Sequence, residues 1–161
     1  MTFIAKHFNE LSPTELYEIL KSRQEIFLLE QNIICQDLDG LDTDALHCFI
    51  MDGGRAVACL RAFYLDRDTV KIGRVLTLTH GAGHGRALME GALSAIAEKM
   101  PAKSITVSAQ TQAAGYYAAF GFIAEGDTYI EDGIEHINQH TVYFFFGRRC
   151  QMIPRKVNQL I

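Results

Sequence analysis

Apolar and polar residues along the chain follow two periods, and each period predicts a different kind of element. Apolar residues recur at helical spacing over 13–29 and over 85–100, so we expect a helix in each range. Ser12 and Glu15 have the spacing of a capping box at the start of the first helix. Pro101 is expected to end the second helix, because proline cannot continue the helical hydrogen bonding.

Runs rich in β-branched and aromatic residues predict seven strands around these helices. The runs are 3–8, 46–51, 55–65, 70–78, 104–110, 123–130 and 137–146, with a short helix over 112–120. Asp52-Gly53-Gly54 and Asp66-Arg67-Asp68 are typical of tight turns, so the second, third and fourth strands are expected to be antiparallel. The predicted order is therefore a strand, a helix, three antiparallel strands, a helix, a strand, a short helix and two closing strands.

A length of 161 residues suits one domain. We expect a folded domain over 1–146 and a basic extension without acidic residues over 147–161. The net charge of −4 argues against a nucleic-acid partner, which usually calls for a basic face. The chain begins without a leader pattern and has no apolar span of about twenty residues, so we predict a cytoplasmic protein without a membrane partner.

The cysteines and histidines carry no metal signature. The 4 cysteines are scattered without a C-x-x-C pair, which predicts neither a disulfide framework nor a zinc site. His136 and His140 would lie about 13 Å apart on one strand, too far to share an ion. We therefore predict no bound metal.

The strongest chemical signal is the turn His80-Gly81-Ala82-Gly83-His84-Gly85, which joins the strand over 70–78 to the helix after it. Glycines allow a close approach of the backbone, and the start of a helix offers free N–H groups and a positive dipole end. The turn therefore predicts a ligand with a phosphate or pyrophosphate. The alternative is a tight turn without any ligand.

Two familiar nucleotide motifs fit this turn poorly. The glycines are spaced G-x-G-x-G and not G-x-G-x-x-G, and the next strand ends at Ser108-Ala109-Gln110 without the acidic residue that binds a ribose. No Gly-Lys-Ser/Thr follows, so a P-loop is excluded. Nicotinamide and nucleoside triphosphates are therefore disfavoured.

The order βααβββαβαββ with this turn after the fourth strand resembles the GNAT superfamily of N-acetyltransferases. Gly81 and Gly83 match the small positions of its Gln/Arg-x-x-Gly-x-Gly/Ala motif, and His80 departs from its first position. The segment 110–122, QTQAAGYYAAFGF, is similar to the family's Asn-x-x-Ala-x-x-Phe-Tyr-x-x-x-Gly-Phe segment. Further residues over 27–32, 36–40, 72–75 and 131–137 are similar to the ElaA-type branch of the superfamily.

The resemblance implies an α/β (α+β) fold with a mixed sheet of about seven strands flanked by helices. It also implies acetyl-CoA as co-substrate and transfer of its acetyl group to a primary amine by direct attack in a ternary complex. By the same resemblance, Tyr117 is the acid that protonates the departing thiolate. The implied cofactor-binding residues are Leu76, Thr77, Leu78, Gly81, Gly83, His84, Gly85, Arg86, Ala87 and Gln110.

A base that takes the proton of the amine is harder to assign. Glu30, His47 and His136 are candidates because carboxylates and imidazoles are the usual bases, and the resemblance favours Glu30. The acceptor is a small molecule or a peptide lysine. A non-catalytic CoA-binding sensor or assembly protein is the alternative function, and an NAD oxidoreductase is a more distant one.

Two further segments leave alternatives open. The acidic segment 31–45 is expected to be a solvated loop or a wall of the acceptor site. The run 142–146, VYFFF, is apolar on both faces, so a second copy of the chain, as in a homodimer, or the C-terminal extension is expected to cover it.

Overall fold

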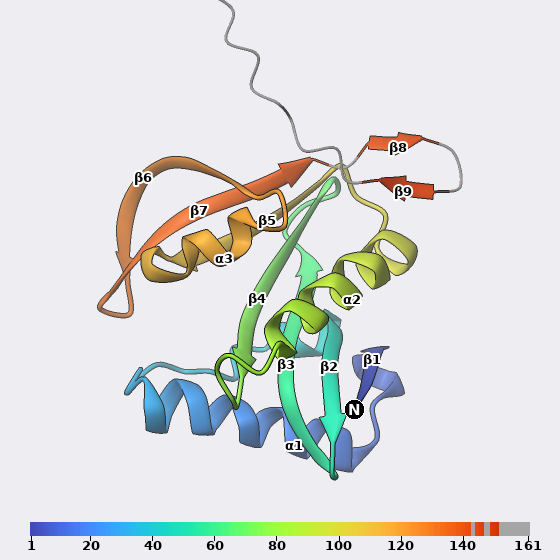
Figure 1. Cartoon of the computed structure of the whole chain (residues 1–161), viewed down its shortest axis with the longest axis vertical. Helices are drawn as coiled ribbons and strands as arrows, with labels where there is room; N and C mark the ends of the chain where they lie inside the picture. Colours follow the sequence, from blue (N-terminus) through green and yellow to red (C-terminus); the bar gives the residue numbers. More distant parts are fainter. Residues whose placement is uncertain (143, 147–148, 152–161) are drawn as a thin grey trace, which may run out of the picture.

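Seven strands form one sheet in the order β1-β2-β3-β4-β5-β7-β6 in the computed structural model, which describes residues 1–142, 144–146 and 149–151 (Figure 1). All neighbouring strands are antiparallel except β4 and β5, which are parallel. The expected mixed seven-stranded sheet is thus confirmed. The strands are β1 Thr2–His7, β2 Leu46–Asp52, β3 Arg55–Tyr64, β4 Thr69–Thr77, β5 Ser104–Gln110, β6 Ile123–Glu131 and β7 Ile134–Val142.

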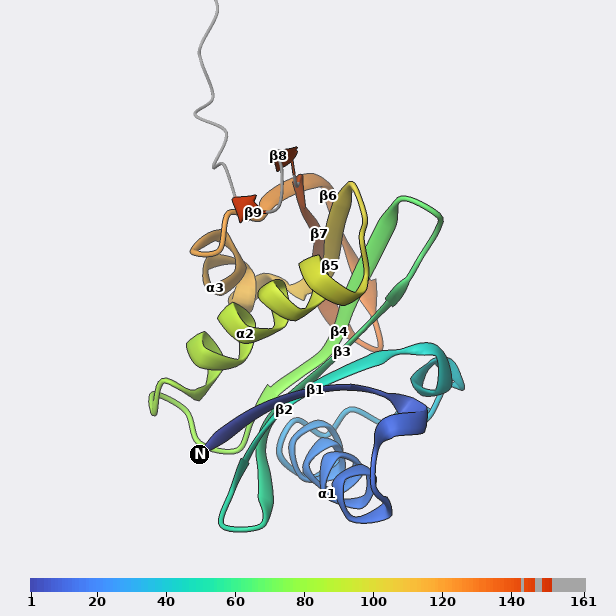
Figure 2. The same ribbon diagram turned by 90° about the vertical axis from the view of Figure 1, so that its right-hand side faces the viewer.

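Helices cover both faces of this sheet (Figure 2). The α-helices are α1 Pro13–Arg23, α2 His84–Lys99 and α3 Ala114–Ala118, and short 3-10 turns lie at η1 Phe8–Glu10, η3 Leu41–Asp44 and η4 Thr111–Ala113. Residues of α2 and α3 pack on one face with β2 to β5, and Ile19 and Ile26 pack on the other face with Phe49 and Leu76. The sheet therefore separates two apolar cores.

The first helix begins where the capping box predicts. The Glu15 N–H donates to Ser12 Oγ at 3.2 Å, and the Ser12 N–H donates to Glu15 Oε2 at 2.8 Å. After Arg23 the helix changes its winding and continues as the π-helix η2 Gln24–Glu30. The expected helix over 13–29 is thus one continuous element, α-helical at first and π-helical at its end. In the order βααβββαβαββ, η2 takes the place of the second helix.

The predicted strand over 137–146 is wrong in its extent. β7 ends at Val142, which pairs with Ser104 at the very start of β5, so the strand has no β5 residue left to pair with beyond this point. The next residues form β8 Phe144–Phe146, which pairs with β9 Arg149–Gln151 in a separate two-stranded sheet. The side chains of 142–146 and most of the basic extension lie outside the described residues. The prediction that a second copy or the extension covers 142–146 therefore stays a prediction.

The edge strand β1 is attached to the sheet and to a helix. It pairs with β2 from Thr2↔Met51 to His7↔Leu46. A Cβ built on Gly91 in α2 would lie 2.6 Å from Phe3 Cε2. Because glycine has no side chain, the Phe3 ring packs directly against the backbone of α2.

Candidate active site

β4 separates from β5 halfway along its length and leaves an open edge. The parallel pairing runs from Thr69↔Ser104 to Ile72↔Val107 and ends there within the described sheet. A β-bulge follows at once, since the register with β3 shifts from Arg61↔Gly73 to Cys59↔Leu76. Arg74 in this bulge has a φ of 54°, the left-handed region that non-glycine residues rarely adopt.

The open edge presents backbone donors. The Leu78 N–H donates to Val57 O at 2.8 Å, which is the β3 side of the strand. Because N–H groups of successive strand residues point to opposite edges, those of Val75 and Thr77 point to the side from which β5 has departed. Two peptide N–H groups are thus directed into the gap between β4 and β5.

The glycine turn after β4 has the backbone of an anion site. Gly81 and Gly83 have φ values of 75° and 79°, and a Cβ on either would meet no atom within 4 Å. The 16-residue helix α2 begins at His84, directly after the turn. His84 Nδ1 is buried without a hydrogen-bond partner. Free helix N–H groups, a dipole end and an unpaired imidazole nitrogen therefore meet at one place.

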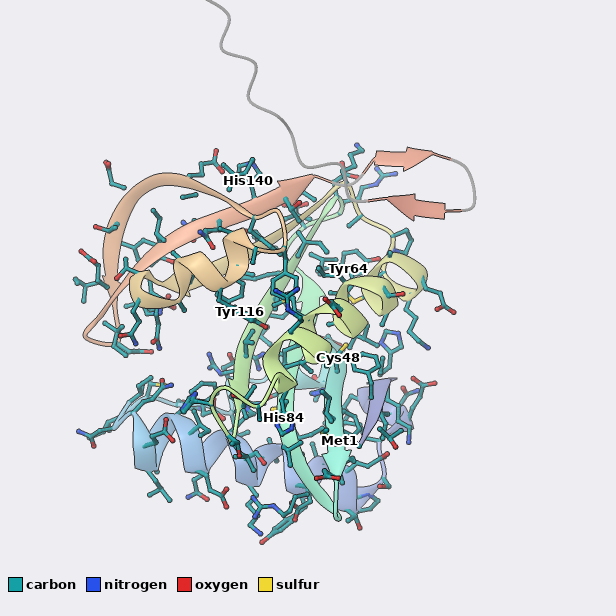
Figure 3. The ribbon with its side chains drawn as sticks, in the orientation of Figure 1. Met1, Cys48, Tyr64, His84, Tyr116 and His140 are labelled. Carbon is teal, nitrogen blue, oxygen red and sulfur yellow. The ribbon has the colours of Figure 1, made fainter. Side chains whose placement is uncertain are left out.

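A cavity of about 440 Å³, here called the glycine-turn pocket, lies between this turn, β4 and α3. Tyr116 lies between α3 and the start of α2 (Figure 3), and its hydroxyl donates to Gly85 O at 2.8 Å. Among the described residues, the lining contains the imidazoles of His80 and His84 and the guanidinium of Arg86. This described lining contains no carboxylate. The pocket thus favours an anionic ligand.

A second cavity of about 260 Å³, here called the hairpin pocket, adjoins the first. It is formed by the segment after η2, by β4 and β5, and by the turn between β6 and β7. Apart from Tyr117, its ionisable residues are Cys35, Asp37, Lys71, Arg74, Glu131, Asp132 and His136. This pocket is therefore more polar than the first and of mixed charge.

Tyr117 lines both pockets. The residues common to the two linings are Gln31, Val75, Ala113 and Tyr117. Tyr117 is 8% exposed, and burial raises the pKa of its phenol far above the usual range, so the hydroxyl stays protonated. Burial also raises the pKa of Tyr116, to about 12. A protonated phenol thus lies where the pockets meet.

The three candidate bases have different surroundings. Glu30 lines neither pocket, and its Oε1 lies 3.2 Å from His80 Nε2 beside the glycine turn. His47 is buried, with Nε2 2.8 Å from Asp42 O, and burial lowers its pKa. His136 lines the hairpin pocket, and its Nδ1 lies 2.8 Å from Ile134 O. When Nδ1 donates to this carbonyl, Nε2 of the neutral imidazole is left as an acceptor.

The implied cofactor residues fall into three groups. Leu76, Thr77, Gly81, Gly83, His84, Gly85 and Arg86 line the glycine-turn pocket. Leu78 and Ala87 do not line this pocket. Leu78 packs instead with the core under α1. Gln110 lines the hairpin pocket, where its Nε2 donates to Gln31 Oε1 at 3.3 Å.

Some lining residues were missed in the sequence. Gln31, Thr79 and Ala113 line the glycine-turn pocket, as does Phe120, whose ring lies 5.7 Å from the Arg86 guanidinium carbon. These residues sit beside the glycine motif or in the 110–122 segment. Gln31 follows η2, and its only signal in the sequence is that it belongs to the 27–32 segment that is similar to the ElaA-type branch.

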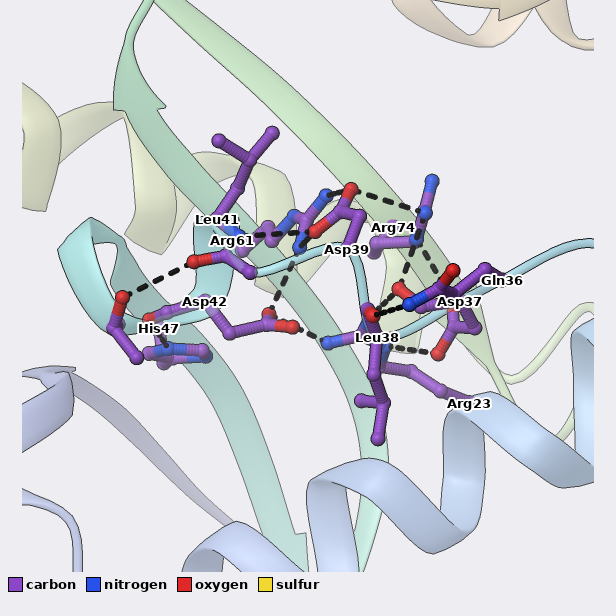
Figure 4. A network of polar contacts seen from close by, with 12 residues as sticks. Arg23, Gln36, Asp37, Leu38, Asp39, Leu41, Asp42, His47, Arg61 and Arg74 are labelled. Carbon is purple, nitrogen blue, oxygen red and sulfur yellow. Dashed lines mark hydrogen bonds and ion pairs between the residues drawn. The ribbon is translucent and has the colours of Figure 1, made fainter.

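The acidic segment 31–45 is held to the sheet by ion pairs. Its carboxylates pair with three arginines in one network (Figure 4), formed by Arg23, Arg61 and Arg74 with Asp37, Asp39 and Asp42. Arg23 is buried, with Nη1 2.6 Å from Asp42 Oδ1 and Nε 2.8 Å from Asp37 Oδ2. Asp37 also lines the hairpin pocket. The network thus fixes one wall of that pocket to the sheet.

Within the described part of the chain, no helix is long and apolar enough to cross a bilayer. The same residues contain no group of three or more histidine, cysteine or acidic side chains arranged to hold a metal ion.

Comparisons with known proteins agree with this geometry. Residues 36–141 match the family model described as the acetyltransferase (GNAT) domain. Protein ElaA of Escherichia coli strain K12 is 36% identical over 137 residues, which cover 81% of this chain and 90% of ElaA. A crystal structure of E. coli ElaA superposes with a TM-score of 0.81 at 33% identity, covering 87% of this chain and 99% of that one.

A crystal structure of an acyl-CoA N-acyltransferase from Pseudomonas aeruginosa is equally similar. It has a TM-score of 0.81 and 35% identity, and the match covers 87% of this chain and 99% of that one. The open edge of β4, the glycine turn and the two pockets thus occur in a fold shared with acyltransferases. The chain belongs to the GNAT acetyltransferase family.

Proposed function

We propose that this protein transfers the acetyl group of acetyl-CoA to a primary amine by direct attack in a ternary complex. The observation that carries the proposal is the meeting of two pockets at Tyr117, beside the open edge of β4. One pocket has the size and charge for a phosphate-bearing ligand, and the other can hold a separate small group. A ternary complex needs two such sites that share a boundary.

The glycine-turn pocket suits CoA on several independent grounds. Gly81, Gly83 and the N–H groups at the start of α2 would hold the pyrophosphate, with His84 Nδ1 as an additional polar partner. Bound acetyl-CoA supplies an activated thioester carbonyl. The N–H groups of Val75 and Thr77 would hydrogen-bond the oxygen of this carbonyl and stabilise its developing negative charge.

We assign the proton transfers to two residues of the shared boundary and the hairpin pocket. Tyr117 would donate its phenolic proton to the departing thiolate, because its raised pKa keeps it protonated. His136 would accept the proton of the amine, directly or through a water, at its free Nε2. It replaces Glu30 in this role, since Glu30 is paired with His80 outside the hairpin pocket.

Calorimetric titration with acetyl-CoA tests the proposal, with NADH as the control ligand. Wild type is compared with Gly83→Trp, which fills the glycine turn, and with Gly54→Trp as the matched variant. Gly54 has a φ of 81° and open space within 4 Å, like Gly83, but it lies in the β2–β3 turn away from both pockets. We expect acetyl-CoA binding by wild type and Gly54→Trp, its loss in Gly83→Trp, and no binding of NADH.

An amine panel then tests turnover by release of free thiol. Acetylation of a primary amine by wild type would support the proposal. Acetyl-CoA binding without turnover on any amine of a broad panel would instead indicate the non-catalytic CoA-binding protein. Failure of wild type to bind acetyl-CoA would contradict both functions.

A further inference from the structure

The bulge in β4 determines which backbone N–H groups of this strand face the gap between β4 and β5. Before it, Val70 and Ile72 pack in the core under α2. After it, Leu76 and Leu78 pack in the opposite core under α1, and Val75 lies on the α2 side again. A regular strand would place alternate residues 70, 72, 74, 76 and 78 on one face, so the bulge shifts the alternation by one residue. Without this shift, the N–H groups of Val75 and Thr77 would point toward β3.

Arg74 adopts the conformation on which the shift depends. Its φ of 54° is unfavourable for a residue with a side chain and persists only when the surroundings hold it. Two aspartates surround its guanidinium: Nε lies 2.7 Å from Asp37 Oδ1, and Nη2 lies 3.3 Å from Asp39 Oδ2. Nη2 also donates to the Asp37 carbonyl oxygen at 3.2 Å.

These aspartates are themselves held by buried arginines. Arg23 Nε bonds Asp37 at 2.8 Å, and Arg61 forms two hydrogen bonds to the Asp39 carboxylate. Figure 4 shows how Asp37 and Asp39 lie between Arg74 on one side and Arg23 and Arg61 on the other. Arg74 thus joins the loop that carries Asp37 and Asp39, part of the hairpin-pocket wall, to the bulge that shapes the open edge of β4.

We propose that Arg74 is a positioning residue for acetyl transfer: its ion pairs with Asp37 and Asp39 hold the β4 bulge and the wall of the hairpin pocket in one fixed arrangement. The proposal rests on the acetyl transfer proposed above. It predicts that loss of the guanidinium misplaces the thioester carbonyl and the amine relative to each other, while the glycine turn still binds CoA.

Three substitutions at this position separate charge from backbone. Arg74→Gly removes the ion pairs but favours the left-handed conformation, so this variant is expected to fold. Arg74→Ala removes the ion pairs and opposes that conformation. Arg74→Lys keeps a charge that can reach one carboxylate at a time. Arg55→Ala is the matched control, because Arg55 pairs with Glu18 and Glu25 at 2.8 Å and lines neither pocket.

We expect kcat for the best amine to fall about 10- to 100-fold in Arg74→Gly and further in Arg74→Ala, with an intermediate loss in Arg74→Lys. The dissociation constant of acetyl-CoA is expected to stay within about twofold of wild type, because the pyrophosphate contacts are untouched. Arg55→Ala is expected to keep the wild-type kcat. Wild-type kcat and acceptor KM in Arg74→Gly would overturn the proposal, as would an equal loss of kcat in Arg55→Ala.

Amide hydrogen exchange provides a measurement that does not depend on activity. The amides of 75–78 are expected to exchange faster in Arg74→Gly than in wild type or Arg55→Ala, because the bulge is less firmly held. Unchanged exchange there would overturn the proposal even if turnover were lost. Wild-type protein that acetylates no amine, combined with faster exchange in Arg74→Gly, would refute the proposed function and keep the structural role of Arg74.

Discussion

At the scale of single residues, the two adjacent tyrosines of α3 have different surroundings. The Tyr116 hydroxyl is already donating to Gly85 O at 2.8 Å, whereas Tyr117 lies where the two pockets meet. We predict that Tyr117→Phe lowers kcat about 10²- to 10⁴-fold, the range of a general acid, without weakening acetyl-CoA binding. Tyr116→Phe is the control, and in steady-state kinetics it is expected to keep most of the activity. Full acetyl transfer by Tyr117→Phe would refute the acid role.

The choice of base is also a question about single side chains. His136 lines the hairpin pocket with Nε2 available, and Glu30 is paired with His80 outside both pockets. We predict that His136→Gln lowers kcat about 100-fold, because glutamine cannot accept and pass on a proton. Glu30→Gln is expected to change kcat by less than about threefold. The reverse order of the two effects would return the base to Glu30.

At the scale of elements, the sequence predicted the order of helices and strands because most boundaries carry local signals. Capping residues, turn glycines and Pro101 mark where elements begin and end, and the structure confirms them. The strand over 137–146 was predicted too long because β7 ends where β5 begins, which is a property of pairing partners and not of the sequence near Val142. The π-helical winding of η2 was equally invisible, since the apolar spacing continues through it.

The capping box at the start of α1 is expected to have a measurable effect on stability. Ser12→Ala removes the acceptor of the Glu15 N–H at the start of α1. We predict a loss of about 1 kcal/mol in the free energy of unfolding, measured by urea denaturation. Thr43→Ala, in the exposed 3-10 turn η3, is the comparison and is expected to cost less. An equal loss in both variants would mean that the cap contributes nothing specific.

At the scale of the whole molecule, the sequence predicted the family fold and the glycine turn after β4, but not the ion-pair network of the acidic segment. An acidic loop usually indicates a solvated segment, so Asp37, Asp39 and Asp42 gave no sign of their partners. The informative residues were the arginines: Arg61 stands in the apolar run over 58–63, and a buried charge of this kind needs an opposite charge. Their partners are far away in the sequence, and only the fold brings them together.

The ion-pair network of Arg23, Arg61 and Arg74 with Asp37, Asp39 and Asp42 makes the free energy of unfolding depend on pH in the acidic range. Arg61 beside Asp39 holds the pKa of that carboxyl well below its usual value of 3.8. Burial disfavours the Asp42 carboxylate, yet its ion pairs with Arg23 and Arg61 outweigh burial and lower its pKa. The unfolded chain therefore binds protons more readily, so this stabilisation is complete above the usual pKa of 3.8 and is lost as the pH falls below it.

We predict that urea denaturation at a series of pH values shows the free energy of unfolding falling steeply below about pH 4. Asp42→Asn is expected to lower this free energy by about 3 kcal/mol at neutral pH and to flatten its dependence on acid. Asp44→Asn, two residues away and exposed, is expected to resemble wild type. Equal slopes for wild type and Asp42→Asn would exclude Asp42 as a source of the acid sensitivity.

The close contact between Phe3 and Gly91 is expected to limit self-association. β1 covers the hydrogen-bonding edge of β2, and an uncovered edge of this kind pairs readily with strands of other chains. Gly91→Val would push the Phe3 ring off α2 and loosen β1, so we predict larger assemblies by light scattering on mild warming. Gly115→Val, where a Cβ meets nothing within 4 Å, is expected to stay dispersed. The absence of a side chain at this one helix position is thus expected to keep the protein dispersed, because it lets the edge strand stay packed on the helix.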